Sequence, residues 1–287
     1  MGIFDRWLIA CDFDNTITNT HGVPVPEKYI SEENAAAIRY FMAEGGIFAV
    51  ATGRSLPDAR PVALGVPSNA PTVIYNGAAI YDYTRGEYVD ARYLTDSVPR
   101  IREYIASVLE KFPKLGAEFY HEDDFIHACA VNSHVLHHRR LSDAPMLEVA
   151  SPAEVPSPIA KILLEGDAET VKEAEQFILS QSWAEEVELV FSFDTLLEVT
   201  AHGCSKADAV RRLAEMFSIH PDRICCAGDH LNDLPMLRVA AVAFAPENAR
   251  EEVKALPGIH IVASPDRGSI RHLVEKLEKL ARQACES

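Results

Sequence analysis

Short apolar runs of four or five residues recur in both terminal parts of the chain and constrain its fold most strongly. They lie at residues 7–11, 47–51, 72–75, 223–227, 241–245 and 259–263. Such runs are typical of strands that are buried on both faces of a sheet. Helices are expected between and after them: one that follows Ser31 as its N-cap and ends at Gly45, with residues 35–42 forming its apolar face, and others at residues 206–217, 231–239, 248–255 and 269–285. This alternation predicts a doubly wound parallel α/β sheet.

The middle of the chain follows a different pattern. Residues 79–83 and 87–93 alternate around Gly86 and indicate a β-hairpin. Strands are then expected at residues 117–120, 125–131, 159–165, 187–191 and 196–199, helices at 98–112 and 169–180, and a surface connection at 142–158. Such a mixture is typical of a separate α+β module inserted into the core. The predicted domains are a core of residues 1–84 and 201–287 and an inserted domain of residues 85–200.

The composition excludes several classes of protein. Hydrophobic residues make up 48% and charged residues 24% of the 287 residues, which is ordinary for a globular protein. The formal net charge of −16 would repel nucleic acids and anionic membranes, so neither is an expected partner. The sequence holds no apolar stretch of about 18 residues that would predict a membrane helix. The first residues do not resemble a secretory signal, and the six cysteines are scattered, so we expect a reducing cytoplasm.

Acidic residues follow two of the predicted strands. Asp12 and Asp14 come directly after the first strand, and Asp229 and Asp233 follow the strand at residues 223–227. The carboxyl ends of parallel strands meet at one edge of a sheet, where ligands bind. A single Asp in a loop is more often a turn former, but four at comparable junctions would repel one another unless a hard cation lay among them. Oxygen ligands of this kind predict Mg²⁺.

Two further features are suited to an anion. Lys206 stands at the start of a predicted helix with Ser205 as its expected N-cap. A solvated lysine is the ordinary interpretation, but the helix dipole disfavours a cation at this end, and a bound anion would explain its placement. The hydroxyl and backbone N–H groups of Thr52 and Gly53 offer a second set of donors. Together these residues predict a phosphate held between a metal, a lysine and a turn.

These residues resemble the haloacid dehalogenase (HAD) superfamily. Its four motifs occur in order, as residues 12–16 (DFDNT), Thr52, Lys206 and residues 228–233 (GDHLND). Further resemblances to the Cof-type branch of phosphatases lie at residues 51–54, 75–78, 197–200 and 246–249. The insertion between the second and third motifs lies where this branch places its α/β cap. The resemblance extends to both ends of the chain and implies that residues 85–200 select the substrate.

The resemblance implies roles for the acids. Asp12 would be the nucleophile that forms an aspartyl-phosphate, and Asp14 would protonate the leaving oxygen and then deprotonate water. Mg²⁺ would be bound by Asp12, the backbone carbonyl of Asp14, Asp229 and, directly or through water, Asp233. Asp14 favours a phosphatase over a dehalogenase, a phosphonatase or an ion pump. Asn15 stands where glycine is usual, but Asn tolerates left-handed geometry, so the turn is expected to survive.

The resemblance also implies which residues would contact the substrate. The expected phosphate-binding residues are Thr52, Gly53, Lys206 and Asn232. The expected substrate-lining residues are Arg54, Asn76 and His230, although Arg54 fits equally well as the partner of a neighbouring acid. The phosphate-binding residues would stabilise the negative charge on the phosphoryl oxygens through the transition state.

Five of the eleven histidines fall within residues 121–138. One interpretation is a transition-metal site, since His134 and His138 are one helical turn apart. The favoured interpretation is a solvated surface of the inserted domain, because no acidic or thiolate partner shows a recognisable spacing.

The sequence therefore predicts an Mg²⁺-dependent phosphatase that hydrolyses phosphate monoesters of small metabolites. Sugar phosphates are the first candidates and a vitamin-like phosphate is the second. A phosphotransferase or phosphomutase of the same fold stays open as an alternative. A non-catalytic regulatory protein that binds a phosphometabolite is disfavoured, because the acids and the lysine are all present. A nucleic-acid phosphatase is disfavoured by the net charge. No oligomeric state is predicted.

Overall fold

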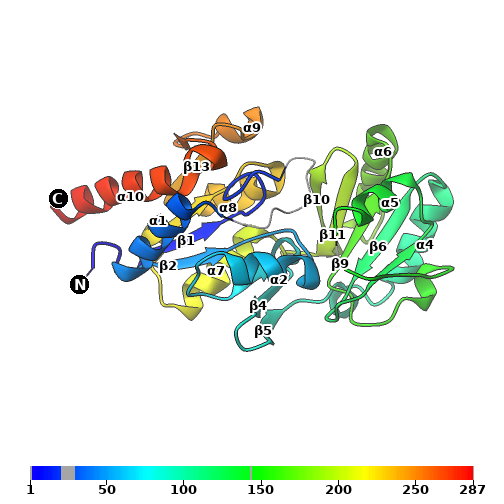
Figure 1. Ribbon diagram of the computed structural model, residues 1–287. Coiled ribbons are helices and arrows are strands. Elements are labelled where there is room, and N and C mark those ends of the chain that lie inside the picture. Colours follow the sequence, from blue (N-terminus) through cyan, green and yellow to red (C-terminus); the bar gives the residue numbers. More distant parts are fainter. Residues whose placement is uncertain (1, 21–29, 143, 287) are drawn as a thin grey trace. The chain divides into compact units, whose positions relative to one another are not determined.

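The computed structural model of the chain describes residues 2–20, 30–142 and 144–286. The chain divides into two compact units, which are described separately (Figure 1). The first unit comprises Met1–Thr52, Ala59–Val89 and Ser205–Ser287, and the second comprises Gly53–Asp58 and Asp90–Cys204. Among the described residues, no helix is both long enough and apolar enough to cross a membrane.

A five-stranded parallel sheet forms the centre of the first unit. Its strand order is β14-β13-β12-β1-β2. The strands are β1 (Leu8–Cys11), β2 (Ile47–Val50), β12 (Ile224–Ala227), β13 (Val242–Pro246) and β14 (His260–Val262). All four neighbouring pairs are parallel, and β1 lies between β2 and β12. The predicted parallel sheet is therefore confirmed, and segments far apart in sequence are direct neighbours in it.

Helices cover both faces of this sheet. Helices of the first unit include α1 (Glu32–Ala43), α7 (Lys206–Met216), α8 (Leu234–Val239), α9 (Glu251–Lys254) and α10 (Ser269–Glu286). In β1, Ile9 and Cys11 belong to one hydrophobic core together with residues of α1 and α10. Leu8 and Ala10 belong to a second core together with residues of α7 and α8. Burial on both faces explains why the strands are continuously apolar.

A small antiparallel sheet stands beside the parallel one. It contains β3 (Thr72–Ile74), β4 (Ala79–Asp82) and β5 (Glu87–Ala91) in this order. A single parallel bridge between Ala51 and Val73 connects it to the end of β2. The helix α2 (Leu56–Gly65) precedes β3 and was not expected, because Pro57 and Pro61 interrupt its apolar pattern.

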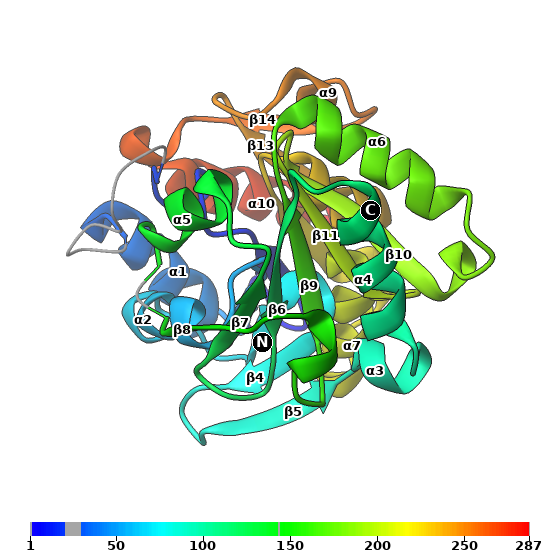
Figure 2. The same ribbon diagram turned by 90° about the vertical axis from the view of Figure 1, so that its right-hand side faces the viewer.

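The second unit is built on a six-stranded sheet with the order β10-β11-β9-β6-β7-β8. Its strands are β6 (Gly116–Tyr120), β7 (Ile126–Cys129), β8 (Met146–Glu148), β9 (Lys161–Glu165), β10 (Val187–Phe193) and β11 (Leu196–Ala201). All of its pairs are antiparallel except β7 with β8. Its helices are α3 (Leu94–Ser97), α4 (Ile101–Lys111), α5 (Ser133–Arg139) and α6 (Ala168–Leu179). Figure 2 shows α4 and α6 on one side of this sheet and α5 on the other.

The predicted α+β character of the inserted region is confirmed, with two differences in detail. The strand β8 lies within residues 142–158, where only a surface connection was expected. The helix α5 was not expected because its seven residues carry only one buried side chain, that of Val135. The long segment of the second unit begins after Val89 and ends at Cys204, a few residues after the predicted boundaries at residues 84 and 200. A substrate-selecting role for the inserted domain stays a prediction.

The histidine-rich segment is less solvated than expected. His121 is only 3% exposed, and its Nδ1 lies 2.8 Å from the carbonyl oxygen of Pro158. Its ring packs edge-to-face against that of His127, with 4.8 Å between the ring centroids. His137 is exposed, whereas His138 next to it is partly buried. The prediction of a uniformly solvated histidine surface is therefore wrong, because strand pairing places part of this segment inside the unit.

Candidate active site

Three carboxylates meet where two neighbouring strands end. Asp12 follows β1, and Asp229 and Asp233 follow β12, whose residue Ala227 is paired with Cys11. One carboxylate oxygen of each Asp lies within 4.8 Å of those of the other two, so the group can hold a metal ion. Asp12 is 5% exposed, Asp229 4% and Asp233 0%. The parallel register of β1 and β12 thus brings these three acids together, as expected.

Lys206 lies among these acids. Its Nζ donates to Oδ1 of Asp12 at 2.5 Å and to Oδ1 of Asp233 at 2.7 Å, and the residue is 1% exposed. Ser205 caps α7 by accepting a hydrogen bond from the backbone N–H of Asp208, which makes Lys206 the first helical residue. Burial alone would lower the pKa of Lys206, but the charges of Asp12 and Asp233 outweigh it and hold that pKa above its usual value. The site therefore keeps a fixed positive charge.

The acids outnumber this positive charge. Burial, followed by the charge of Asp233, raises the pKa of Asp12 to about 7, although Lys206 opposes the shift. Burial and the charges of Asp12 and Asp233 raise the pKa of Asp229 to about 9. The raised values show that the cluster favours additional positive charge, either as protons or as a cation.

The loop after β12 is organised around Asp233. Its Oδ2 accepts hydrogen bonds from the backbone N–H groups of Asp229 at 2.9 Å and His230 at 3.0 Å. A Cβ atom at Gly228 would lie 2.4 Å from Cβ and Cγ of Asp233, so the loop requires glycine there. Since Oδ1 accepts from Lys206, both oxygens of Asp233 are engaged. Asp233 therefore holds the shape of the loop as well as the position of the lysine.

The loop after β1 carries Asp14 and is held by its neighbours. Asp14 is partly exposed, and its Oδ1 accepts a hydrogen bond from the hydroxyl of Thr20 at 2.7 Å. Asn15 has φ of 58°, so the expected left-handed geometry is confirmed. The hydroxyl of Thr16 donates to Oδ1 of Asp229 at 3.1 Å, and Asn248 Nδ2 donates to the carbonyl oxygen of Asn15 at 2.8 Å. The first contact joins the two acid-bearing loops, and the second joins the loop after β1 to the segment after β13.

Thr20 and Asn248 were not among the predicted site residues. Asn248 lies in the local resemblance at residues 246–249, which was a usable signal. Thr20 stands beyond the motif at residues 12–16, so its contact with Asp14 depends on how the loop folds back.

Three polar residues lie at the ends of β2, β3 and β12. Thr52 is 1% exposed, and its carbonyl oxygen accepts from the backbone N–H of Asn76 at 3.2 Å. Asn232 Nδ2 donates to Oδ1 of Asn76 at 3.0 Å. The Nδ2 group of Asn76 is buried and has no hydrogen-bond partner among the described residues. This donor is therefore available to a ligand.

Three predicted site residues remain, one in the first unit and two in the second. His230 belongs to the first unit, and its Nε2 lies 3.4 Å from Nη1 of Arg250. Gly53 and Arg54 belong to the second unit. There the carbonyl oxygen of Gly53 accepts from Lys161 Nζ at 2.9 Å, and Arg54 donates to the carbonyl oxygen of Asp58 at 3.4 Å. The structure does not place these two residues relative to the acids.

Curated relatives match nearly the whole chain. A putative phosphatase of Haemophilus influenzae is 26% identical over 271 residues, covering 93% of this chain and 97% of that protein. The HMP-PP phosphatase of Serratia proteamaculans is 23% identical over 270 residues, covering 93% and 94%. The chloroplastic endoribonuclease YBEY of Arabidopsis thaliana is 24% identical over 276 residues, and the chain spans only 44% of its length.

Solved structures share the fold. A haloacid dehalogenase-like hydrolase from Bacteroides thetaiotaomicron matches with a TM-score of 0.77 and 22% identity, covering 95% of this chain and all of the other (100%). A sugar phosphatase of HAD subclass IIB matches with a TM-score of 0.75 and 20% identity, covering 94% and 98%.

A doubly wound core with acids at its strand ends and a separate, mostly antiparallel second unit defines the HAD fold class. The model of the haloacid dehalogenase-like hydrolases matches residues 9–272, so the chain belongs to that family. The predicted fold, superfamily and enzyme class, a phosphoric monoester hydrolase, are confirmed.

Proposed function

We propose that the chain hydrolyses phosphate monoesters of small metabolites through an aspartyl-phosphate on Asp12, with Mg²⁺ as cofactor. The observation that carries the proposal is the buried group of Asp12, Lys206, Asp229 and Asp233. A fixed ammonium beside acids that favour a further cation suits an anionic substrate which arrives together with a metal.

The donor set fits Mg²⁺, because it consists of buried oxygen ligands in excess of the local positive charge. Asp12, Asp229 and the backbone carbonyl of Asp14 would hold the ion. Since both oxygens of Asp233 already accept hydrogen bonds, a water-mediated contact suits it better than direct ligation. When bound, Mg²⁺ would neutralise the acids and polarise the phosphoryl group.

The chain's own residues would then perform both chemical steps. A carboxylate oxygen of Asp12 attacks phosphorus while the Asp14 carboxyl gives its proton to the leaving oxygen. Asp14 then takes a proton from the water that attacks the aspartyl-phosphate, which releases phosphate and restores Asp12. The hydrogen bond from Thr20 orients Asp14 for both transfers.

Other residues would hold the phosphoryl oxygens. Lys206 fixes the Asp12 side chain and supplies positive charge to the reacting phosphoryl group. Thr52 after β2 and Asn232 after β12 would be further donors, and the free Nδ2 group of Asn76 belongs to the same group.

Sugar phosphates are the proposed substrate class. One solved structure of the same fold is described as a sugar phosphatase. Two relatives carry other names, HMP-PP phosphatase and, at 26% identity, 5-amino-6-(5-phospho-D-ribitylamino)uracil phosphatase of Bacillus subtilis. We propose that residues of the inserted domain select among such metabolites.

The test measures phosphate release from a panel of sugar, nucleotide and vitamin phosphates, with and without Mg²⁺. Asp12→Asn should lower kcat on the order of 10⁴-fold or more, because it removes the nucleophile. Asp222→Asn is the matched control, since Asp222 is exposed. Acid quenching during turnover of a ³²P-labelled substrate should trap labelled wild-type protein and no labelled Asp12→Asn protein. Full activity of Asp12→Asn would refute the mechanism, and a phosphorylated organic product in place of phosphate would indicate the phosphotransferase.

A further inference from the structure

The second unit contains a buried acidic cluster that the proposed function does not use. Glu118 of β6 and Glu165 of β9 are both 0% exposed. Because Gly116 pairs with Glu165 and Glu118 with Leu163, the two glutamates lie diagonally on the same face of the sheet. His138 of α5 reaches this face, and the three residues form what we term the Glu118–His138–Glu165 cluster.

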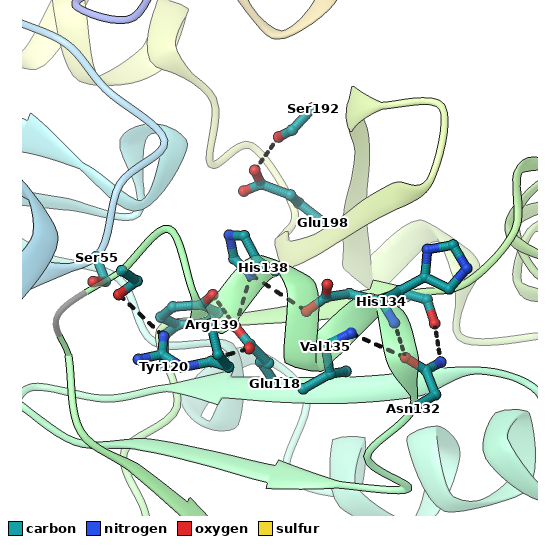
Figure 3. A network of polar contacts seen from close by, with 12 residues as sticks. Ser55, Glu118, Tyr120, Asn132, His134, Val135, His138, Arg139, Ser192 and Glu198 are labelled. Carbon is teal, nitrogen blue, oxygen red and sulfur yellow. Dashed lines mark hydrogen bonds and ion pairs between the residues drawn. The ribbon is translucent and has the colours of Figure 1, made fainter. Parts of the chain in front are cut away.

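One atom of His138 lies close to both carboxylates. Its Nδ1 is 3.2 Å from Oε2 of Glu118 and 3.4 Å from Oε1 of Glu165. Figure 3 shows the imidazole directed toward Glu118, with Arg139 and Tyr120 beside it. One ligand atom from each of the three residues lies within 4.8 Å of the other two. The cluster therefore has the compactness of a metal site.

Three of the four carboxylate oxygens of the cluster lack a hydrogen-bond donor within the described part of the chain. Oε1 of Glu118 and both oxygens of Glu165 are buried and accept no hydrogen bond from any described residue. The Tyr120 hydroxyl donates to Oε2 of Glu118, and Arg139 Nε is 4.0 Å from its Oε1. A protonated His138 would offer only one N–H at Nδ1 to two carboxylates. Buried polar atoms without hydrogen-bond partners are costly, and a bound cation would satisfy those of Glu165.

We propose that Glu118, His138 and Glu165 bind one transition-metal dication, with Zn²⁺ as the first candidate. An imidazole together with two carboxylates suits zinc better than Mg²⁺, which prefers oxygen alone. Ligands at about 2.0–2.1 Å in a tetrahedron lie roughly 3.3–3.4 Å apart, which agrees with the two distances from Nδ1. The metal takes the place of the Nδ1 proton of His138, which is released to solvent, and water fills the fourth position.

Such a metal would fasten α5 to the sheet. His138 belongs to α5, whereas the glutamates belong to β6 and β9. Val135 is the one buried residue of α5, and Arg139 Nε of the same helix lies 4.0 Å from Oε1 of Glu118. The inference is independent of the proposed phosphatase function, since all three ligands lie in the second unit.

The first test counts bound zinc. Tag-free protein is stripped with EDTA and dialysed against Zn²⁺ with excess Mg²⁺, and zinc is measured by mass spectrometry. We expect one zinc per wild-type chain and none with Glu165→Gln or His138→Gln. His137→Gln is the matched control on α5 and should keep its zinc. Asp229→Asn should keep its zinc too, because it alters only the first unit. Absence of zinc in the wild type, or zinc retained by both cluster variants, would overturn the proposal.

The second test needs no variant that must fold. In ¹⁵N-histidine spectra of the wild-type protein, Zn²⁺ should shift one Nδ1 resonance in proportion to the zinc added and leave the proton on Nε2. If no histidine resonance responds to zinc, the site does not exist as proposed.

Discussion

The two buried acidic clusters differ in what neutralises them. In the first unit the cation is Lys206, a fixed ammonium that two aspartates hold. In the second unit it is His138, for which burial opposes the charge but Glu118 and Glu165 raise the pKa to about 10. In our two proposals, the ammonium of Lys206 attracts a phosphate, whereas the two carboxylates beside His138 attract a metal cation. The same excess of acid therefore suits two different kinds of ligand.

The largest effect on stability and activity is expected from removal of the Lys206 ammonium. Lys206→Ala leaves Asp12 and Asp233 buried without their cation, so we expect the free energy of unfolding to fall by about 3–5 kcal/mol and activity to be lost. Urea denaturation followed by circular dichroism measures the first effect. Lys279→Ala, at an exposed position, is the control. Wild-type stability of Lys206→Ala would show that the acids do not depend on this charge.

Asp14→Asn separates proton transfer from nucleophilic attack. We expect kcat for an alkyl phosphate to fall roughly 10²–10⁴-fold, because the leaving alkoxide then lacks its proton donor. The loss should be smaller for p-nitrophenyl phosphate, whose leaving group is stable without a proton. Equal losses for both substrates would contradict the role of Asp14 as general acid.

The two clusters should also respond to pH in different ranges. In metal-free protein, Asp12 and Asp229 have pKa values raised from 3.8 to about 7 and about 9 by burial and neighbouring acids. The folded state keeps these protons while the unfolded state loses them, so the free energy of unfolding should fall as the pH rises from about 4 to 9. Asp229→Asn should flatten this slope.

For His138 the pKa rises from 6.5 to about 10, so its contribution is complete below pH 6.5 and is lost as the pH rises through 10. His138→Gln should therefore flatten only the upper part of the curve. Thermal melts between pH 5 and 10 in EDTA measure both slopes. Identical curves for the two variants would show that the two clusters do not titrate over different, partly overlapping ranges.

The smallest expected effect concerns the hydrogen bond to Asp14. Thr20→Val removes one donor, worth about 1 kcal/mol, so kcat should fall roughly fivefold. Thr84→Val removes a similar bond to Asp82 at an exposed turn and should leave kcat unchanged. An unchanged kcat in Thr20→Val would show that Asp14 is oriented without it.

Local sequence patterns predicted the strands and acids of the first unit well, but they did not predict the Glu118–His138–Glu165 cluster. The apolar strands and the acids that follow them are adjacent in sequence, and parallel pairing then brings Asp12 and Asp229 together. Glu118 and Glu165 are brought together by the pairing register of two antiparallel strands that are distant in sequence. His138 is supplied by a short helix that was not expected. Their spacing along the chain carries no repeated pattern, which is why the histidines were predicted to be solvated. The same holds for Thr20, whose contact depends on loop geometry.

The position of β1 between β2 and β12 has a consequence for synthesis on the ribosome. Asp12 is synthesised 194 residues before Lys206. At usual translation speeds, roughly 10–40 s pass between the two. During that interval the second unit is synthesised completely, while β1 still lacks the neighbour on its β12 side. The buried group of Asp12, Lys206, Asp229 and Asp233 can therefore assemble only after the residues of β12 and the loop that follows it have been synthesised.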